Sequence, residues 1–167
     1  SSDLYHNLSE NEKALIPIFI QIADIMDDLF WKQTFGDKTM IDTIKDSYTK
    51  EFAIINYGAW DRLDNNTSFI SGYGEKPLGC QYYPIDITAE EYAQFADENK
   101  GSLYTVLRRN EDGTLKTVWY KDEYKTELAK VCELLDQAIA IAEDAGLKKY
   151  LTERKKAFLT DDYFASD

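Results

Sequence analysis

Residues 56–86 read NYGAWDRLDNNTSFISGYGEKPLGCQYYPID, and neither a helical nor a strand period lasts more than a few residues within them. Glycine permits positive φ and proline removes a backbone donor, so the glycines and prolines of this stretch interrupt regular elements. A disordered linker would be poor in aromatic residues, whereas this stretch carries six. We therefore expect an ordered, packed loop that presents a surface. The alternative is a structural meander with a couple of short strands.

The beginning of this loop is the most suggestive cluster for binding. Tyr57 and Trp60 offer flat apolar area with a polar group at one end. Asp61 and Arg62 could form a pair or contact a ligand. In the alternative interpretation, Trp60 anchors the core, while Asp61 and Arg62 satisfy the backbone of the loop.

Composition narrows the class of protein. The 167 residues suffice for one domain with a substantial core, and 44% hydrophobic with 30% charged residues is ordinary for a soluble globular protein. The net charge of −12 argues against binding to nucleic acid or to an anionic membrane surface, because both need a basic face. No membrane span and no signal peptide are visible. The sequence begins abruptly, so a targeting segment could have been trimmed, and both cytoplasm and periplasm stay open.

The N-terminal part of the chain predicts two helices. Ser9 followed three residues later by Glu12 is a capping box, which starts a helix over residues 9–33. Pro17 deletes one hydrogen bond inside this helix and either bends or splits it. A shorter helix is predicted over residues 38–47, and the segment between it and the loop could be helical or extended.

A short helix and a β-hairpin are predicted after the loop. Thr88 and Glu91 repeat the capping-box spacing and predict a helix over residues 89–98. Asp112-Gly113 between two alternating apolar runs is a strong hairpin signal. The strands of this hairpin are expected at residues 103–109 and 114–120.

Two helices are predicted at the C-terminal end, over residues 122–145 and 147–159. They form an αα-hairpin, with Gly146 as the C-terminal cap of the first helix. The predicted fold class is therefore mostly α (α+β): a helical domain with one small β-hairpin and a long ordered loop. The prediction for the domain organisation is a single domain over residues 1–167.

Groups that could carry out chemistry are scarce. His6 is the sequence's one histidine and lies near the N-terminus, so neither a catalytic zinc centre nor a Ser-His-Asp or Cys-His arrangement is indicated. Cys80 and Cys132 lack metal-ligand spacing, and whether they pair in a disulfide stays open. The glycines around residue 73 form no phosphate loop. Three helical carboxylates could perform acid–base chemistry or bind a cation, but a solvated helix face is the favoured interpretation: Asp24, Asp27 and Asp28.

Two motifs make the sequence resemble a known family. NYGxWDRL is matched by Asn56–Leu63, and KPxGxxxYPxDxTxEE by Lys76–Glu91. Together with LYTVLRRNEDGTL and the final LTDDYFASD, they are similar to the front part of bacterial zinc-dependent hydrolases. Those proteins resemble dipeptidyl peptidase III metallopeptidases, and also a peptidase-like region joined to a Nudix domain in plants. The similarity extends from about Leu8 to the last residue.

The resemblance implies a role without catalytic residues. In that family a His-Glu-x-x-His helix and a downstream glutamate bind zinc and activate water, and this sequence contains no such motif. The family's chains also continue further. The resemblance therefore implies the N-terminal portion of a larger metallohydrolase, with no catalytic or metal residue and no cofactor in this chain. Zinc is expected in the missing catalytic part.

The expected partners are the remainder of the same polypeptide, as a catalytic lobe, and a peptide substrate. By analogy with two-lobed peptidases, the loop would line or support the peptide cleft through substrate or interlobe contacts. A rival hypothesis is a stand-alone module that binds a peptide or glycan through its aromatic loop, and a third is a scaffold whose apolar faces dock a partner lobe. The candidate substrate-binding residues are Tyr57, Trp60, Asp61, Arg62, Tyr82 and Tyr83.

Overall fold

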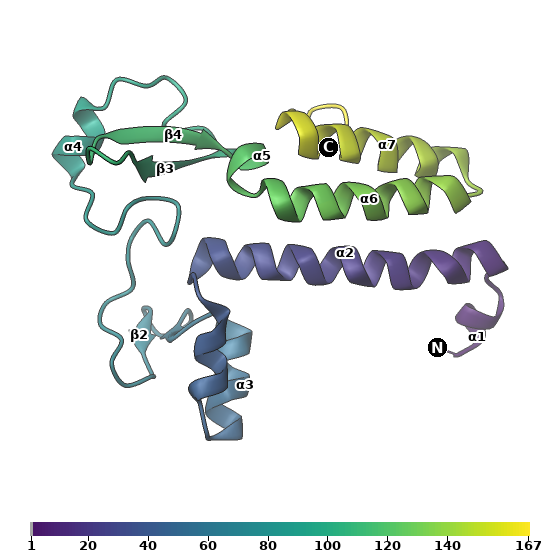
Figure 1. The fold of residues 1–167 in the computed structure, drawn as a ribbon. Coiled ribbons are helices and arrows are strands. Elements are labelled where there is room, and N and C mark those ends of the chain that lie inside the picture. The colour runs from purple at the N-terminus through teal and green to yellow at the C-terminus, as the bar shows by residue number, and fades with distance from the viewer. Residues whose placement is uncertain (1) are drawn as a thin grey trace. The chain divides into compact units, whose positions relative to one another are not determined.

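The structure, a computed structural model, describes residues 2–167. The chain divides into two compact units. The first comprises the residues up to Asp27 together with Trp119–Asp167, and the second comprises Asp28–Val118. The elements are helical for the most part, with two small two-stranded sheets, so the predicted fold class is confirmed (Figure 1). That residues 1–167 form one domain of a larger protein stays a prediction.

The first unit is all helical. It contains α1 (Ser2–His6), the part of α2 (Glu10–Thr34) up to Asp27, α5 (Tyr120–Glu123), α6 (Lys125–Ile141) and α7 (Ala145–Thr160). Helices α6 and α7 form the predicted αα-hairpin and run side by side in Figure 1. These two helices carry most of the buried apolar residues of this unit, among them Leu128, Val131, Leu135, Ala138, Leu151, Ala157 and Phe158.

The start of α2 confirms the predicted capping box. The Ser9 backbone N–H donates to Glu12 Oε2 at 2.7 Å, and the Glu12 N–H donates to Ser9 Oγ at 3.1 Å. Ser9 Oγ also donates to Glu143 Oε2 at 2.8 Å, which ties this helix start to the connection between α6 and α7. Helix α2 continues through Pro17 without a break, so the split considered from the sequence does not occur.

The C-terminal helices differ from the prediction at their shared end. Helix α6 ends at Ile141, and Gly146 lies in the first turn of α7, so its predicted role as a C-cap is wrong. Asp144 is the reason: its side chain accepts a hydrogen bond from the Leu147 N–H at 2.7 Å and so caps the N-terminus of α7. Cys132 is buried on α6, and both cysteines are free thiols.

The second unit contains η1 (Lys38–Thr43), α3 (Ser47–Asn56), α4 (Ala89–Gln94) and four short strands. Strands β1 (Trp60–Asp61) and β2 (Thr67–Ser68) pair antiparallel, with Trp60 opposite Ser68 and Asp61 opposite Thr67. Strands β3 (Thr105–Arg109) and β4 (Leu115–Trp119) form the predicted hairpin. The core of the second unit includes Trp31, Ala53, Ala59, Val106 and Leu107.

Two predictions for this unit are corrected, and one alternative that the sequence left open is decided. The expected helix over residues 38–47 is a 3₁₀ turn that ends at Thr43, because Asp46 caps the separate helix α3 through Thr49. The segment before the loop is helical. Helix α4 ends at Gln94, four residues earlier than expected.

The long loop is ordered, and its beginning forms the short β1–β2 ladder that the alternative interpretation allowed. The turn into it is tight. Tyr57 adopts a left-handed conformation, with φ 52°, and Gly58 has φ 148°. A Cβ on Gly58 would lie 2.7 Å from Cδ2 of Phe35, so the backbone approaches that ring more closely than a side chain permits.

No helix in the described part of the chain has the length and apolar character that a membrane crossing requires.

Candidate functional site

A pocket of about 790 Å³ opens on the second half of the long loop. We call it the loop pocket. Most of its lining is apolar, with Glu75 and Lys76 contributing charge. Pockets of this size and character are typical ligand sites. The lining residues are Glu75, Lys76, Pro77, Leu78, Gly79, Cys80, Tyr83, Pro84, Ile85, Ile87, Thr88, Ala89 and Tyr92.

Two tyrosines meet in the wall of the loop pocket. The rings of Tyr83 and Tyr92 are edge-to-face, with centroids 5.8 Å apart. Burial raises the pKa of Tyr83, and the neighbouring Tyr92, to which it is hydrogen-bonded, raises it further. Gly79 makes room for this arrangement, because a Cβ there would overlap Cδ2 of Tyr83. The position of the Tyr83 ring therefore depends on a glycine four residues before it.

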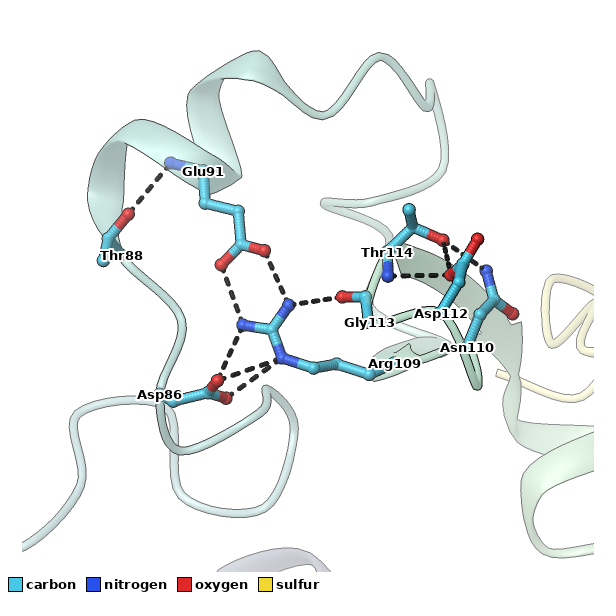
Figure 2. A network of polar contacts seen from close by, with 8 residues as sticks. All are labelled: Asp86, Thr88, Glu91, Arg109, Asn110, Asp112, Gly113 and Thr114. Atoms are coloured by element: carbon cyan, nitrogen blue, oxygen red, sulfur yellow. Dashed lines mark hydrogen bonds and ion pairs between the residues drawn. The ribbon is translucent and has the colours of Figure 1, made fainter.

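A cluster of ion pairs joins the long loop and α4 to the β3–β4 hairpin (Figure 2). Arg109, at the end of β3, donates from Nη1 and Nη2 to the two carboxylate oxygens of Glu91 at 2.6 and 2.9 Å. Its Nε lies 3.1 Å from both carboxylate oxygens of Asp86. Nη1 also donates to the Gly113 carbonyl at 2.8 Å, so the guanidinium connects the loop, α4 and the hairpin turn.

These contacts shift the pKa values of all three side chains in the cluster. Hydrogen bonds from Arg109 hold the pKa of Asp86 and of Glu91 below their ordinary values, and the positive charge of the arginine acts in the same direction. The two carboxylates in turn raise the pKa of Arg109. All three groups are therefore charged at neutral pH, as a two-pronged arginine–carboxylate pair requires.

The other end of α4 is held by Lys100. Its Nζ donates to the carbonyls of Tyr92 and Phe95, both at 2.7 Å, and lies 4.7 Å from the centroid of the Tyr92 ring. Helix α4 has no buried residue. Its place beside the loop pocket thus depends on a cation at each end more than on apolar packing.

The structure places Trp60, a predicted site residue, in the core. It is 8% exposed, and its Nε1 donates to the Gly74 carbonyl at 2.8 Å. Its ring contacts Phe35 and Tyr73, at centroid distances of 5.6 and 5.9 Å. One edge of Trp60 also lines a second pocket of about 610 Å³, which shares Glu75, Pro77 and Ile85 with the loop pocket.

The neighbouring predicted residues hold the backbone of the loop. Asp61 accepts the Leu63 N–H at 2.9 Å, and Arg62 donates from Nη2 to the Ile55 carbonyl at 2.9 Å, near the C-terminal end of α3. Tyr57 is half-buried, with its ring 4.7 Å from that of Phe30 and 5.2 Å from that of Trp31. These contacts agree with the alternative that the sequence left open, in which the cluster stabilises the loop.

Tyr82 joins the loop to two other elements. Its carbonyl accepts the Leu107 N–H of β3 at 2.8 Å, and its hydroxyl donates to Gln33 Oε1 of α2 at 3.3 Å. Of the six candidate residues, Tyr83 lines the loop pocket and Trp60 the second pocket. Whether any of the six contacts a substrate stays a prediction.

Sequence reasoning missed several residues of this site. Leu78 and Ile85 are 107% and 83% exposed on the loop pocket, and each lies one residue after a proline. An apolar side chain directly after a proline in an irregular loop could have indicated an exposed apolar surface. Arg109 carried no comparable signal, because its partners lie 18 and 23 residues away in the sequence.

Zinc, the metal that the resemblance implies, does not fit these residues. Among the side chains that the structure describes, no group of three or more from His, Cys, Asp or Glu is arranged to hold a metal ion. Zinc sites in proteins use three or four such ligands.

Known structures share this architecture. Dipeptidyl peptidase III from Caldithrix abyssi and from Corallococcus sp. strain EGB each match 96% of the chain with a TM-score of 0.86 and 32% sequence identity. The chain resembles dipeptidyl peptidase III. It spans 33% of the length of each of those structures, and the resemblance expected from the sequence motifs is confirmed.

A plant protein is also similar. Nudix hydrolase 3 of Arabidopsis thaliana is 22% identical over 223 aligned residues, which cover 96% of this chain and 29% of the plant protein. No protein-family model matches the chain. Its similarity is thus to about a third of each of these longer proteins.

Proposed function

We propose that this chain is a non-catalytic part of a zinc-dependent peptidase of the dipeptidyl peptidase III type, in which the long loop lines or supports a peptide cleft. The observation that carries the proposal is the match of 96% of the chain to a third of two dipeptidyl peptidase III structures at 32% identity. The chain would be the N-terminal portion of that polypeptide, and the remainder would supply the zinc site and the catalytic lobe.

The loop pocket supports the peptide-binding part of the proposal. Proline, leucine, isoleucine and tyrosine side chains line it, which suits the apolar side chains of a peptide. Arg109 and Lys100 hold α4 in place as one wall, so the surface is formed before a ligand arrives.

A stand-alone peptide-binding module is the second candidate, and the same pocket favours it. The pocket is complete within residues 75–92 and needs no other part of the polypeptide to define its lining. A peptide fits this apolar lining better than a glycan, whose hydroxyl groups need many polar partners.

The test compares the 167-residue chain with the longer polypeptide encoded by its gene. With a dipeptidyl arylamide as substrate, we expect hydrolysis by the longer polypeptide, loss with a chelator, recovery with zinc, and none by the chain alone. Leu78→Ala and Ile85→Ala should raise KM with little change in kcat, because they remove ground-state binding. Leu103→Ala is the matched control, since Leu103 is 82% exposed and lies outside the pocket.

Two outcomes would reject the proposal. Hydrolysis by the chain alone, tracking the purified protein and lost with a chelator, would show that it is itself catalytic. A reading frame that stops at Asp167, with direct peptide binding by the chain, would favour the stand-alone module.

A further inference from the structure

Helix α3 has its apolar stripe on the side that faces solvent. Tyr48, Phe52 and Ile55, at positions i, i+4 and i+7, are 81%, 39% and 58% exposed. Residues with this spacing lie on one face of a helix. We call these three residues, with Phe69, the outer face of α3. The ring of Phe69 lies 4.7 Å from that of Phe52, measured between centroids.

The inward side of the same helix is the more polar one. Lys50 is half-buried there, followed by the buried Ala53 and Asn56. Asn56 satisfies its own amide, because Oδ1 accepts the Arg62 N–H at 3.1 Å and Nδ2 donates to the Phe52 carbonyl at 3.1 Å. A helix on the surface of a globular protein normally shows the opposite pattern, with its apolar stripe toward the core.

The outer face of α3 is also hollowed. A depression of about 490 Å³ is lined by Tyr48, Thr49, Glu51, Phe52, Ile55 and Phe69. Four of these six side chains are large and apolar, and Glu51 contributes one negative charge at the rim. Contiguous apolar patches of this kind mark surfaces that another protein segment covers.

We infer that an apolar segment from the remaining part of the same polypeptide covers the outer face of α3. The inference rests on the proposed function, because it takes this chain as a third of a longer protein. The chain spans 33% of the length of the dipeptidyl peptidase III structures that it matches, so most of such a polypeptide lies outside these residues. A covering segment from that part would complete the burial that the inverted pattern of α3 lacks. A cation at its edge would pair with Glu51.

Hydroxyl-radical footprinting of the longer polypeptide tests this inference. We expect oxidation of Tyr48 and Phe52 to be several-fold slower than in the 167-residue chain, while Leu63, which is 98% exposed and lies off the outer face, keeps its reactivity. Equal oxidation of Tyr48 in both proteins would overturn the inference. Protection that disappears on dilution, together with dimers in light scattering, would also overturn it and assign the face to a second copy.

A substitution provides a second measurement that does not require the short chain to fold. Ile55→Glu places a charge where the covering segment would lie, so the longer polypeptide should unfold at a lower temperature, whereas Leu63→Glu should leave it unchanged. Equal unfolding temperatures for both variants and the unmodified protein would contradict the inference. These readouts are independent of peptidase activity: an active polypeptide with an uncovered α3 rejects only this inference, and an inactive one with a covered α3 rejects only the proposed function.

Discussion

Arg109 and Glu91 form a bidentate ion pair, with Nη1–Oε1 at 2.6 Å and Nη2–Oε2 at 2.9 Å. This pair and the bond to Asp86 join the end of β3 to the start of α4. Helix α4 is six residues long and buries none of them, so its attachment is polar. Arg109 therefore holds the start of α4 in the wall of the loop pocket, as Lys100 holds its other end.

Replacing Arg109 should loosen that wall. We expect Arg109→Ala to lower the thermal unfolding midpoint and to speed hydrogen exchange in α4, because Glu91 and Asp86 lose their shared partner. Arg109→Lys should recover only part of the loss, since an ammonium group cannot form the two-pronged contact. Lys116→Ala on the neighbouring strand β4 is the control, because Lys116 is exposed. Equal exchange in α4 for all three variants would contradict a role for Arg109 in holding the helix.

The same cluster should make stability depend on pH. The pKa values of Asp86 and Glu91 are lowered in the folded protein from ordinary values of 3.8 and 4.5. Their contribution is therefore complete above about pH 4.5 and is lost as pH falls through the folded-state values. Asp37, Asp46 and Asp112 have lowered pKa values too, because a nearby threonine donates to each.

A difference measurement isolates the cluster from these other carboxylates. The gap in unfolding free energy between the unmodified protein and Arg109→Ala, measured by urea titration, should be widest near neutral pH and should narrow below pH 4.5. A gap that stays constant down to pH 2 would show that the ion pairs contribute nothing to it.

Substitutions of Trp60 separate its core role from a role in binding. Trp60→Phe keeps an aromatic ring against Phe35 and Tyr73 but loses the bond to the Gly74 carbonyl, so it should cost about 1 kcal/mol. Trp60→Ala should cost about 3–5 kcal/mol, because it also leaves a cavity. Urea unfolding followed by circular dichroism measures both. If Trp60→Ala abolished peptide binding and left stability unchanged, Trp60 would be a ligand contact instead.

Gly79 offers a way to move a wall of the loop pocket without replacing any of its side chains. Gly79→Ala should push the Tyr83 ring away and separate it from Tyr92, because the new Cβ would overlap Cδ2 of Tyr83. In an active longer polypeptide, KM should rise with kcat nearly unchanged. Gly74→Ala is the matched control, since nothing lies within 4 Å of a Cβ at that position. The same KM for both variants would exclude the loop pocket from substrate binding.

The elements that local chemistry controls could be predicted from the sequence. The Ser9–Glu12 capping box marked the start of α2, and Asp112-Gly113 marked the β3–β4 hairpin, because each signal is contained within a few residues. Gly146 misled because Asp144, two residues earlier, is a stronger start signal than the glycine is a stop signal. The hydrogen bond from the Leu147 N–H to Asp144 decides between the two signals, so the helix starts where the glycine predicted a helix end.

The candidate site was less accessible from the sequence. That Arg62 donates to a carbonyl of α3, and Tyr82 to Gln33 of α2, depends on where the chain returns in space. Periodicity also could not show that α3 carries its apolar stripe outward, because the pattern of a helix gives its faces and not what covers them. The aromatic character of the loop was visible, but its division between core and surface was not.

The backbone and its neighbours require the order tyrosine then glycine at positions 57 and 58. A left-handed φ costs a tyrosine on the order of 1 kcal/mol, a penalty that the ring contacts with Phe30 and Trp31 offset. Exchanging the two residues would remove the backbone strain at position 57 but would also remove the tyrosine ring from its contacts with Phe30 and Trp31. At position 58, the new side chain would clash with Phe35. The fold therefore accommodates tyrosine followed by glycine and not the reverse order, although both positions have a positive φ.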